Sequence, residues 1–182
     1  MRASRSTLAL ASVVLAAASL TACSTPEASA ACPTGAPSTA NSPDWTYQGQ
    51  TGSIVVTGPS DTASPQITVE KPFSVEQTHV QAFNPPGDGA VVGDTATVSV
   101  CYLGVNGRTG ERFDSTYDRG KPASFSLDGV IPGFKKAIAG NKVGTSVGVA
   151  IAPADGYVTG QPSAGIQAGD TLIFAIKILS AS

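Results

Sequence analysis

The alternation of polar and apolar residues predicts that the second half of the chain is built mainly from β-strands. The clearest strand covers residues 95–103. Within it Val98, Val100 and Tyr102 share one face, because successive side chains of a strand point to opposite sides. Cys101 consequently faces away from Tyr102. Further strands are predicted over residues 66–70, part of 75–83, 123–127, 143–152 and 171–179.

Only residues 132–139 have a helical pattern. Pro132 suits a first helical turn, where its missing N–H costs nothing. Gly140 suits the left-handed residue that commonly ends a helix, and Phe134 and Ile138 share one face. Several antiparallel-type strands with one short helix indicate an α+β fold.

The N-terminal residues have the pattern of a targeting segment. Arg2 and Arg5 precede an apolar stretch over residues 8–20, which is short for a bilayer span. Residues 1–22 are therefore predicted to be a signal peptide. The stretch ends in Leu-Thr-Ala-Cys at Cys23, which resembles the lipobox of bacterial lipoproteins, in which this cysteine becomes the lipid-modified N-terminus. We expect anchoring on the extracytoplasmic face of the cell membrane; an ordinary secreted protein is the alternative.

Residues 23–64 are predicted to be a flexible tether that leads to a domain at residues 65–182. Ser, Thr, Ala, Pro and Gly dominate residues 24–43, which hold too few bulky apolar residues to bury a core. Residues 53–57 have the pattern of a short strand, and Trp45 is compatible either with packing on the domain or with exposure. The sequence leaves both alternatives open for this stretch.

The charge of the chain argues against nucleic-acid binding. Removing residues 1–22 takes away two of eleven basic residues and leaves nine against thirteen acidic ones, a net charge of −4. The densest remaining basic run is the pair Lys135 and Lys136. Phosphate binding needs many clustered cations, so we expect no nucleic-acid partner.

Two of the three cysteines remain once Cys23 is assigned to the lipid anchor. Disulfides persist in exported proteins, so we hypothesise that Cys32 and Cys101 form one. A metal site is the weaker alternative, because the only histidine, His79, is distant from both cysteines in the sequence. We expect neither a metal nor a cofactor.

Five aromatic residues recur inside short motifs of fixed order. Tyr102 follows Val-Ser-Val-Cys, Phe113 opens Phe-Asp-Ser-Thr, and Phe134 follows Gly-Val-Ile-Pro-Gly. Tyr157 ends Ala-Pro-Ala-Asp-Gly-Tyr, and Phe174 ends Thr-Leu-Ile-Phe. This series resembles FKBP-type peptidyl-prolyl cis-trans isomerases, in a bacterial, actinobacterial-like lipoprotein form. The resemblance covers most of the chain after the tether.

The resemblance implies an antiparallel sheet wrapped around the single short helix, with a pocket between them. It implies an enzyme that rotates X–Pro peptide bonds, whose barrier is about 18–20 kcal/mol because rotation breaks amide resonance. Implied partners are proline-containing unfolded or exported proteins, and macrolide inhibitors such as rapamycin. A domain of this size is expected to be a monomer.

The resemblance also assigns roles to residues. It makes Tyr102 an aromatic wall, Asp114 the carboxylate that orients groups around the substrate carbonyl, and Tyr157 a phenol donor to the ligand. The backbone N–H of Ile131 is expected to bond a substrate or inhibitor carbonyl. The remaining expected contacts are Phe113, Phe125, Val130, Phe134, Ile166 and Phe174.

Three positions depart from the family pattern. Ala123 stands where many members have a pocket Phe, Val158 where Gly is usual after the Tyr, and Asp128 where Gly commonly precedes the Val-Ile turn. Ala123 opens one wall, and Val158 alters the loop that carries Tyr157. These two departures favour the alternative function, an FKBP-fold binding or chaperone lipoprotein with little or no turnover.

Overall fold

The structure is a computed structural model that describes residues 31–37 and 42–182. The predicted signal peptide at residues 1–22 and the lipidation site at Cys23 lie outside the described residues.

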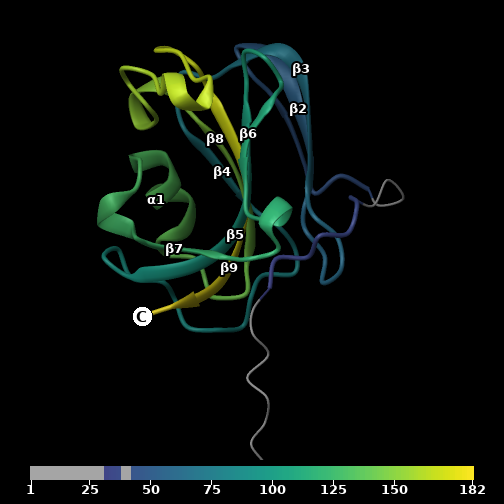
Figure 1. The fold of residues 1–182 in the computed structure, drawn as a ribbon, viewed down its shortest axis with the longest axis vertical. Coiled ribbons are helices and arrows are strands. Elements are labelled where there is room, and N and C mark those ends of the chain that lie inside the picture. The colour runs from purple at the N-terminus through teal and green to yellow at the C-terminus, as the bar shows by residue number, and fades with distance from the viewer. Residues whose placement is uncertain (1–30, 38–41) are drawn as a thin grey trace, which may run out of the picture.

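The main sheet has six antiparallel strands in the order β4-β8-β9-β5-β6, with β7 also paired to β5. Helix α1 lies against one face of this sheet (Figure 1). The α+β fold and the single short helix expected from the sequence are confirmed. The elements are β4 (His79–Ala82), β5 (Thr97–Asn106), β6 (Arg112–Ser115), β7 (Ala123–Ser126), α1 (Pro132–Ile138), β8 (Ser146–Ile151) and β9 (Leu172–Ala181).

Strands β5 and β9 lie at the centre of the main sheet because both of their faces are apolar and buried. In β9, Phe174 faces the core that contains α1, while Ile173 and Ala175 face a second core on the opposite side. In β5, Tyr102 faces α1 and Cys101 faces away from it, as the alternation predicted.

Helix α1 packs closely on β8. Pro132 occupies the first helical turn, and Gly140 follows the helix with a φ of 78°, as expected for a left-handed end. A Cβ atom on Gly133 would lie 2.3 Å from Cγ2 of Ile151, so only glycine allows this approach. The short helix can therefore reach the sheet and leave a pocket beside it.

A small sheet covers the face of the main sheet that α1 leaves free (Figure 1). It consists of β1 (Trp45–Gln48), β2 (Thr51–Thr57) and β3 (Gln66–Ser74), paired antiparallel in that order. Ile54 and Val56 of β2 are fully buried, and they pack with Trp45 against the underside of β9. This second core holds the small sheet to the domain.

The folded domain begins earlier than the predicted boundary at residue 65. Residues 45–57 form strands, and Gly35 pairs with Ala63 in an isolated bridge. The predicted tether of residues 23–64 is thus partly domain. The composition of this stretch did not indicate the hairpin, because it contains few large apolar residues. Three large side chains, together with backbone pairing, are nevertheless enough to hold a short hairpin on an apolar sheet face.

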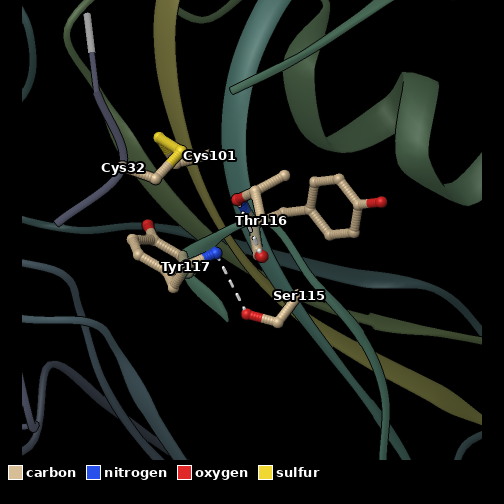
Figure 2. Close-up of a disulfide and its surroundings, with 6 residues drawn as sticks. Cys32, Cys101, Ser115, Thr116 and Tyr117 are labelled. Carbon is tan, nitrogen blue, oxygen red and sulfur yellow. Dashed lines mark hydrogen bonds between the residues drawn. A yellow bond between two sulfur atoms is a disulfide. The ribbon is translucent and has the colours of Figure 1, made fainter. Parts of the chain in front are cut away.

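A disulfide joins Cys32 to Cys101 of β5 (Figure 2), the pairing that we hypothesised from the sequence. Both cysteines are buried in a third apolar cluster together with Leu103 and Tyr117. The disulfide therefore ties the segment that precedes the small sheet to the central strand, on the face opposite Tyr102.

Short 3-10 turns link several strands. The turns are η1 (Tyr117–Arg119), η2 (Leu127–Gly129), η3 (Pro153–Asp155) and η4 (Pro162–Ala164).

Within residues 31–37 and 42–182, no helix is long and apolar enough to cross a membrane.

Candidate functional site

A pocket of about 310 Å³ opens between α1 and the main sheet. Nine of the ten predicted pocket residues line it, and Gly129 is the one lining residue that the sequence did not indicate. Gly129 opens the Gly-Val-Ile-Pro-Gly motif that precedes Phe134, but it was assigned no contact because it has no side chain. The lining residues are Tyr102, Phe113, Asp114, Phe125, Gly129, Val130, Ile131, Phe134, Tyr157 and Phe174.

Ile166 is the predicted contact that the lining lacks. Its side chain is 2% exposed and belongs to the core beside α1. The residue follows Gly165, whose φ of 70° ends the turn η4, and its backbone bonds with Gln161. Ile166 therefore anchors the loop that carries Tyr157, and its side chain is used in packing.

Aromatic rings from different elements form the inner surface of the pocket. The ring of Phe134 on α1 meets those of Tyr102 and Phe174 edge to face, with centroids 5.8 and 5.3 Å apart. Phe113 on β6 meets Phe174 at 5.5 Å and 87°. Phe125 on β7 lies 6.0 Å from Phe134. Edge-to-face contacts of this kind are favourable and hold the rings in a fixed arrangement.

Gly104 makes room for two of these rings. A Cβ atom at this position of β5 would lie 2.7 Å from Cζ of Phe113 and 2.9 Å from Cε1 of Phe174. Any other residue would push the aromatic side chains out of place. The motifs around Tyr102 did not indicate this role, because it depends on contacts between three separate strands.

The polar side of the pocket is a network of three side chains. The phenol of Tyr102 donates to one oxygen of Asp114, and Arg119 donates to the other over 2.8 Å. Arg119, from η1, was not found from the sequence, because a charged residue in a turn looks the same whether or not it faces a site. Asp114 is held by two elements and does not point freely into the pocket.

The network sets the protonation of its members. Burial alone would raise the pKa of the Asp114 carboxyl, but hydrogen bonds from Arg119 and Tyr102 outweigh it and lower that pKa below its usual value. Burial, followed by the hydrogen bond to Asp114, raises the pKa of Tyr102 to about 12. The pocket therefore presents an ionised carboxylate beside a neutral phenol over the whole physiological range.

Two further donors lie at the pocket rim. The backbone N–H of Ile131, at the start of α1, has no hydrogen-bond partner among the residues that the structure describes. Tyr157 lines the pocket with 37% of its surface exposed. Both positions suit the predicted bonds to a substrate carbonyl, a role that stays a prediction.

The residues that depart from the family pattern lie outside the lining. Ala123 of β7 is half-buried and packs on the main core. Val158 is 64% exposed. Asp128 pairs with Lys135 of α1 over 2.8 Å. Within residues 31–37 and 42–182, no group of three His, Cys, Asp or Glu residues is placed to hold a metal ion.

Comparison with known proteins identifies the family. The family model for the FKBP-type peptidyl-prolyl cis-trans isomerases matches residues 89–179. A probable FK506-binding protein of Corynebacterium glutamicum is 41% identical over 96 residues, which cover 52% of this chain and 80% of that protein. The chain belongs to the FKBP-type peptidyl-prolyl cis-trans isomerase family.

A longer relative and two solved structures are also similar to this chain. The isomerase FkpA of Escherichia coli is 39% identical over 94 residues, 51% of this chain and 34% of FkpA, so the match spans about a third of that protein. The crystal structure of FkpA superposes with a TM-score of 0.52 at 35% identity, covering 58% of this chain and 48% of FkpA. AtFKBP13 superposes with a TM-score of 0.51 at 24% identity, covering 58% of this chain and 93% of AtFKBP13, and shares the fold.

Proposed function

We propose that this protein is a peptidyl-prolyl cis-trans isomerase that speeds X–Pro isomerisation in exported proteins as they fold. The observation that carries the proposal is the pocket. Rings from five helices and strands, one ionised carboxylate and the N–H of Ile131, which has no partner among the described residues, converge there. The family model covers every residue that lines the pocket. Such a site needs no nucleophile, since no bond is made or broken.

The pocket accelerates rotation by favouring the twisted amide. A planar X–Pro amide carries partial charge on its carbonyl oxygen, which water stabilises. The aromatic walls around Phe134 exclude that water and accommodate the proline ring. In the twisted state amide resonance is lost. A site shaped for the twisted amide binds the transition state more tightly than either planar form of the peptide bond.

Polar groups at the rim orient the peptide. The N–H of Ile131 is placed to donate to a carbonyl of the substrate, and the phenol of Tyr157 to donate at the exposed edge. Asp114 accepts the hydrogen bond from the phenol of Tyr102 and so holds that side chain in place within the wall. Because most of the side chains that line the pocket are apolar, we expect a preference for an apolar residue before the proline.

We further propose that the protein acts from the outer face of the cell membrane, anchored by lipid at Cys23. The apolar stretch at residues 8–20 and the sequence Leu-Thr-Ala-Cys support export and lipidation. Replacing Cys23 by Ser should release the chain into the medium, and mass spectrometry of the native N-terminal peptide should find acyl chains. An unmodified cysteine there would refute the anchor.

An FKBP-fold module that holds proline segments without turnover is the second candidate. The exposed Val158 and the small Ala123 favour it, because neither supplies a wall on its side of the site. An isomerisation assay with a proline-containing peptide separates the two. Acceleration that rapamycin inhibits supports the enzyme, whereas binding without acceleration supports the module.

A further inference from the structure

The loop between β8 and β9 carries Tyr157 to the pocket but contains little regular structure. Its backbone bonds are short-range, such as Gly160 N–H to Tyr157 carbonyl and the pair between Gln161 and Ile166. A segment with so few bonds to its surroundings opens easily on its own. The loop therefore keeps Tyr157 at the pocket through its contacts with the rest of the domain, one of which is the packing of Ile166 in the core beside α1.

Asp170, at the end of this loop, receives an unusual number of hydrogen bonds. Its side chain is 4% exposed. Arg108 donates to both carboxylate oxygens, over 2.8 and 3.1 Å, and Asn106 donates over 2.6 Å. The N–H of Gln167 adds a bond from within the loop over 2.8 Å. A carboxylate so surrounded is fully satisfied and fixes the direction of the chain that carries it.

The donors come from the hairpin that builds the opposite wall. Asn106 ends β5 and Arg108 follows it in the turn to β6, the strand of Phe113 and Asp114. Arg108 also donates to the carbonyl of Gly165, over 3.4 Å. The hairpin that carries Phe113 and Asp114 is thus joined to the β8–β9 loop through Asn106 and Arg108.

The other end of the loop is fastened independently. Lys136 of α1 donates to Asp155 over 2.7 Å, and the hydroxyl of Thr78 donates to it over 2.6 Å. Tyr157 follows Asp155 by two residues, so its position is restrained from that side. Between the two aspartates, the buried side chain of Ile166 attaches the loop to the core, and Asp170 fixes the point at which the loop rejoins the sheet.

We propose that Arg108 and Asp170 are positioning residues of the substrate site: their ion pair holds the β8–β9 loop closed so that Tyr157 completes the pocket. This inference rests on the proposed isomerase function. Loss of the pair leaves the rings and Asp114 in place and lets the loop open. If the closed fraction falls to about one tenth, the apparent Kd for substrate rises about tenfold while bound substrate turns over as before.

The test compares Arg108→Gln and Asp170→Asn with the wild type, using the mature chain in detergent. Arg112→Gln is the matched control, because this arginine lies on the same hairpin but pairs with Asp118 in solvent. For one proline-containing peptide, calorimetry gives the Kd and exchange NMR gives the rate of isomerisation in the complex. Hydrogen exchange compares amides of residues 157–168 with those of β5 and β9.

The proposal expects Kd to rise about tenfold in both variants with the bound rate within about twofold of wild type. In these two variants, amide hydrogen exchange should become faster only within residues 157–168. The control variant Arg112→Gln should match the wild type in both Kd and hydrogen exchange. Unchanged Kd, or exchange accelerated equally in β5 and β9, would overturn it. If the wild type binds without turnover, the isomerase function fails, and Kd still decides the role of the pair. A wild type that neither binds nor turns over would overturn both.

Discussion

Asp114 is the single acidic side chain among the described residues that line the pocket, and its neighbours define its state. Tyr102 and Arg119 each bond one of its oxygens, so the carboxylate has no need of solvent to remain ionised. Its contribution at this scale is to orient the wall of the pocket. Replacing it should affect substrate binding and rotation more than stability, since its side chain is 39% exposed.

Changing Asp114 to Leu should lower kcat/KM for an X–Pro peptide several-fold, about 3- to 10-fold, because the loss of one charged hydrogen-bond network is worth about 1 kcal/mol in such a half-exposed place. The measurement is a coupled isomerisation assay with circular dichroism as the check on folding. Asp118→Leu, at an exposed ion pair nearby, is the control. Equal activity of the Asp114 variant and the wild type would show that the site is assigned wrongly.

The pH dependence follows from the same network. The pKa of Asp114 is lowered in the folded protein, so the working ionised form persists from high pH down to below its ordinary value of about 3.9. Tyr102, with its pKa raised to about 12, stays protonated throughout. We expect kcat/KM to be flat between about pH 5 and 8 and to fall only in stronger acid. An inflection between these limits would mean that another group controls activity.

The sequence predicted individual site residues where a motif carried a side chain to the pocket. Tyr102, Asp114 and Phe134 were found in this way, and the structure brings them together. Gly104 and Arg119 were missed. Gly104 acts by leaving room for two aromatic rings, and Arg119 acts by donating to Asp114, five residues earlier in the chain. Neither role can be recognised from a local sequence pattern.

At the scale of elements, the pocket depends on how closely α1 approaches β8. Gly133 allows this contact, since its Cα lies against the buried Ile151. Helix length matters too. With seven residues, α1 is too short to be stable alone and takes its stability from packing on the sheet.

Gly133→Ala should destabilise the protein by about 1–2 kcal/mol, because overpacking costs about 1–3 kcal/mol while the better helix propensity of Ala returns at most about 1 kcal/mol. The free energy of unfolding in urea is the measurement. Gly93→Ala is the control, because a Cβ there would meet nothing within 4 Å. A Gly133 variant as stable as the wild type would contradict the tight contact between helix and sheet.

Strongly alternating elements were predictable, and weakly alternating ones were not. The predicted strand at residues 171–179 corresponds to β9, and the predicted helix ends within one residue of α1. The hairpin of β1 and β2 was left undecided because Ser, Thr and Gly dilute its pattern. Its burial depends on the underside of β9, which is a tertiary contact.

At the scale of the whole molecule, three apolar clusters surround the main sheet. The family model matches residues 89–179, so the small sheet, β4 and the segment at Cys32 lie outside the matched region. The small sheet covers the face of the main sheet opposite the pocket, whereas β4 extends the main sheet at its edge beside β8. They make the domain larger than the matched unit without altering the lining of the site.

The disulfide holds this addition in place. Cys32→Ser should lower the free energy of unfolding by about 4 kcal/mol, because the bond closes a loop of 69 residues and limits the unfolded chain. Urea unfolding under non-reducing conditions measures the loss. Reduced wild type should match the variant, and a loss well under about 1 kcal/mol would contradict the expected restraint on the unfolded chain.

The most direct test of the account is the rate of prolyl isomerisation catalysed by the chain from residue 24 onward. The substrate is an X–Pro peptide with an apolar residue before the proline, measured with and without rapamycin. We predict an acceleration that is proportional to protein concentration, abolished by the macrolide and reduced by Asp114→Leu. A folded chain that leaves the uncatalysed rate unchanged would contradict it.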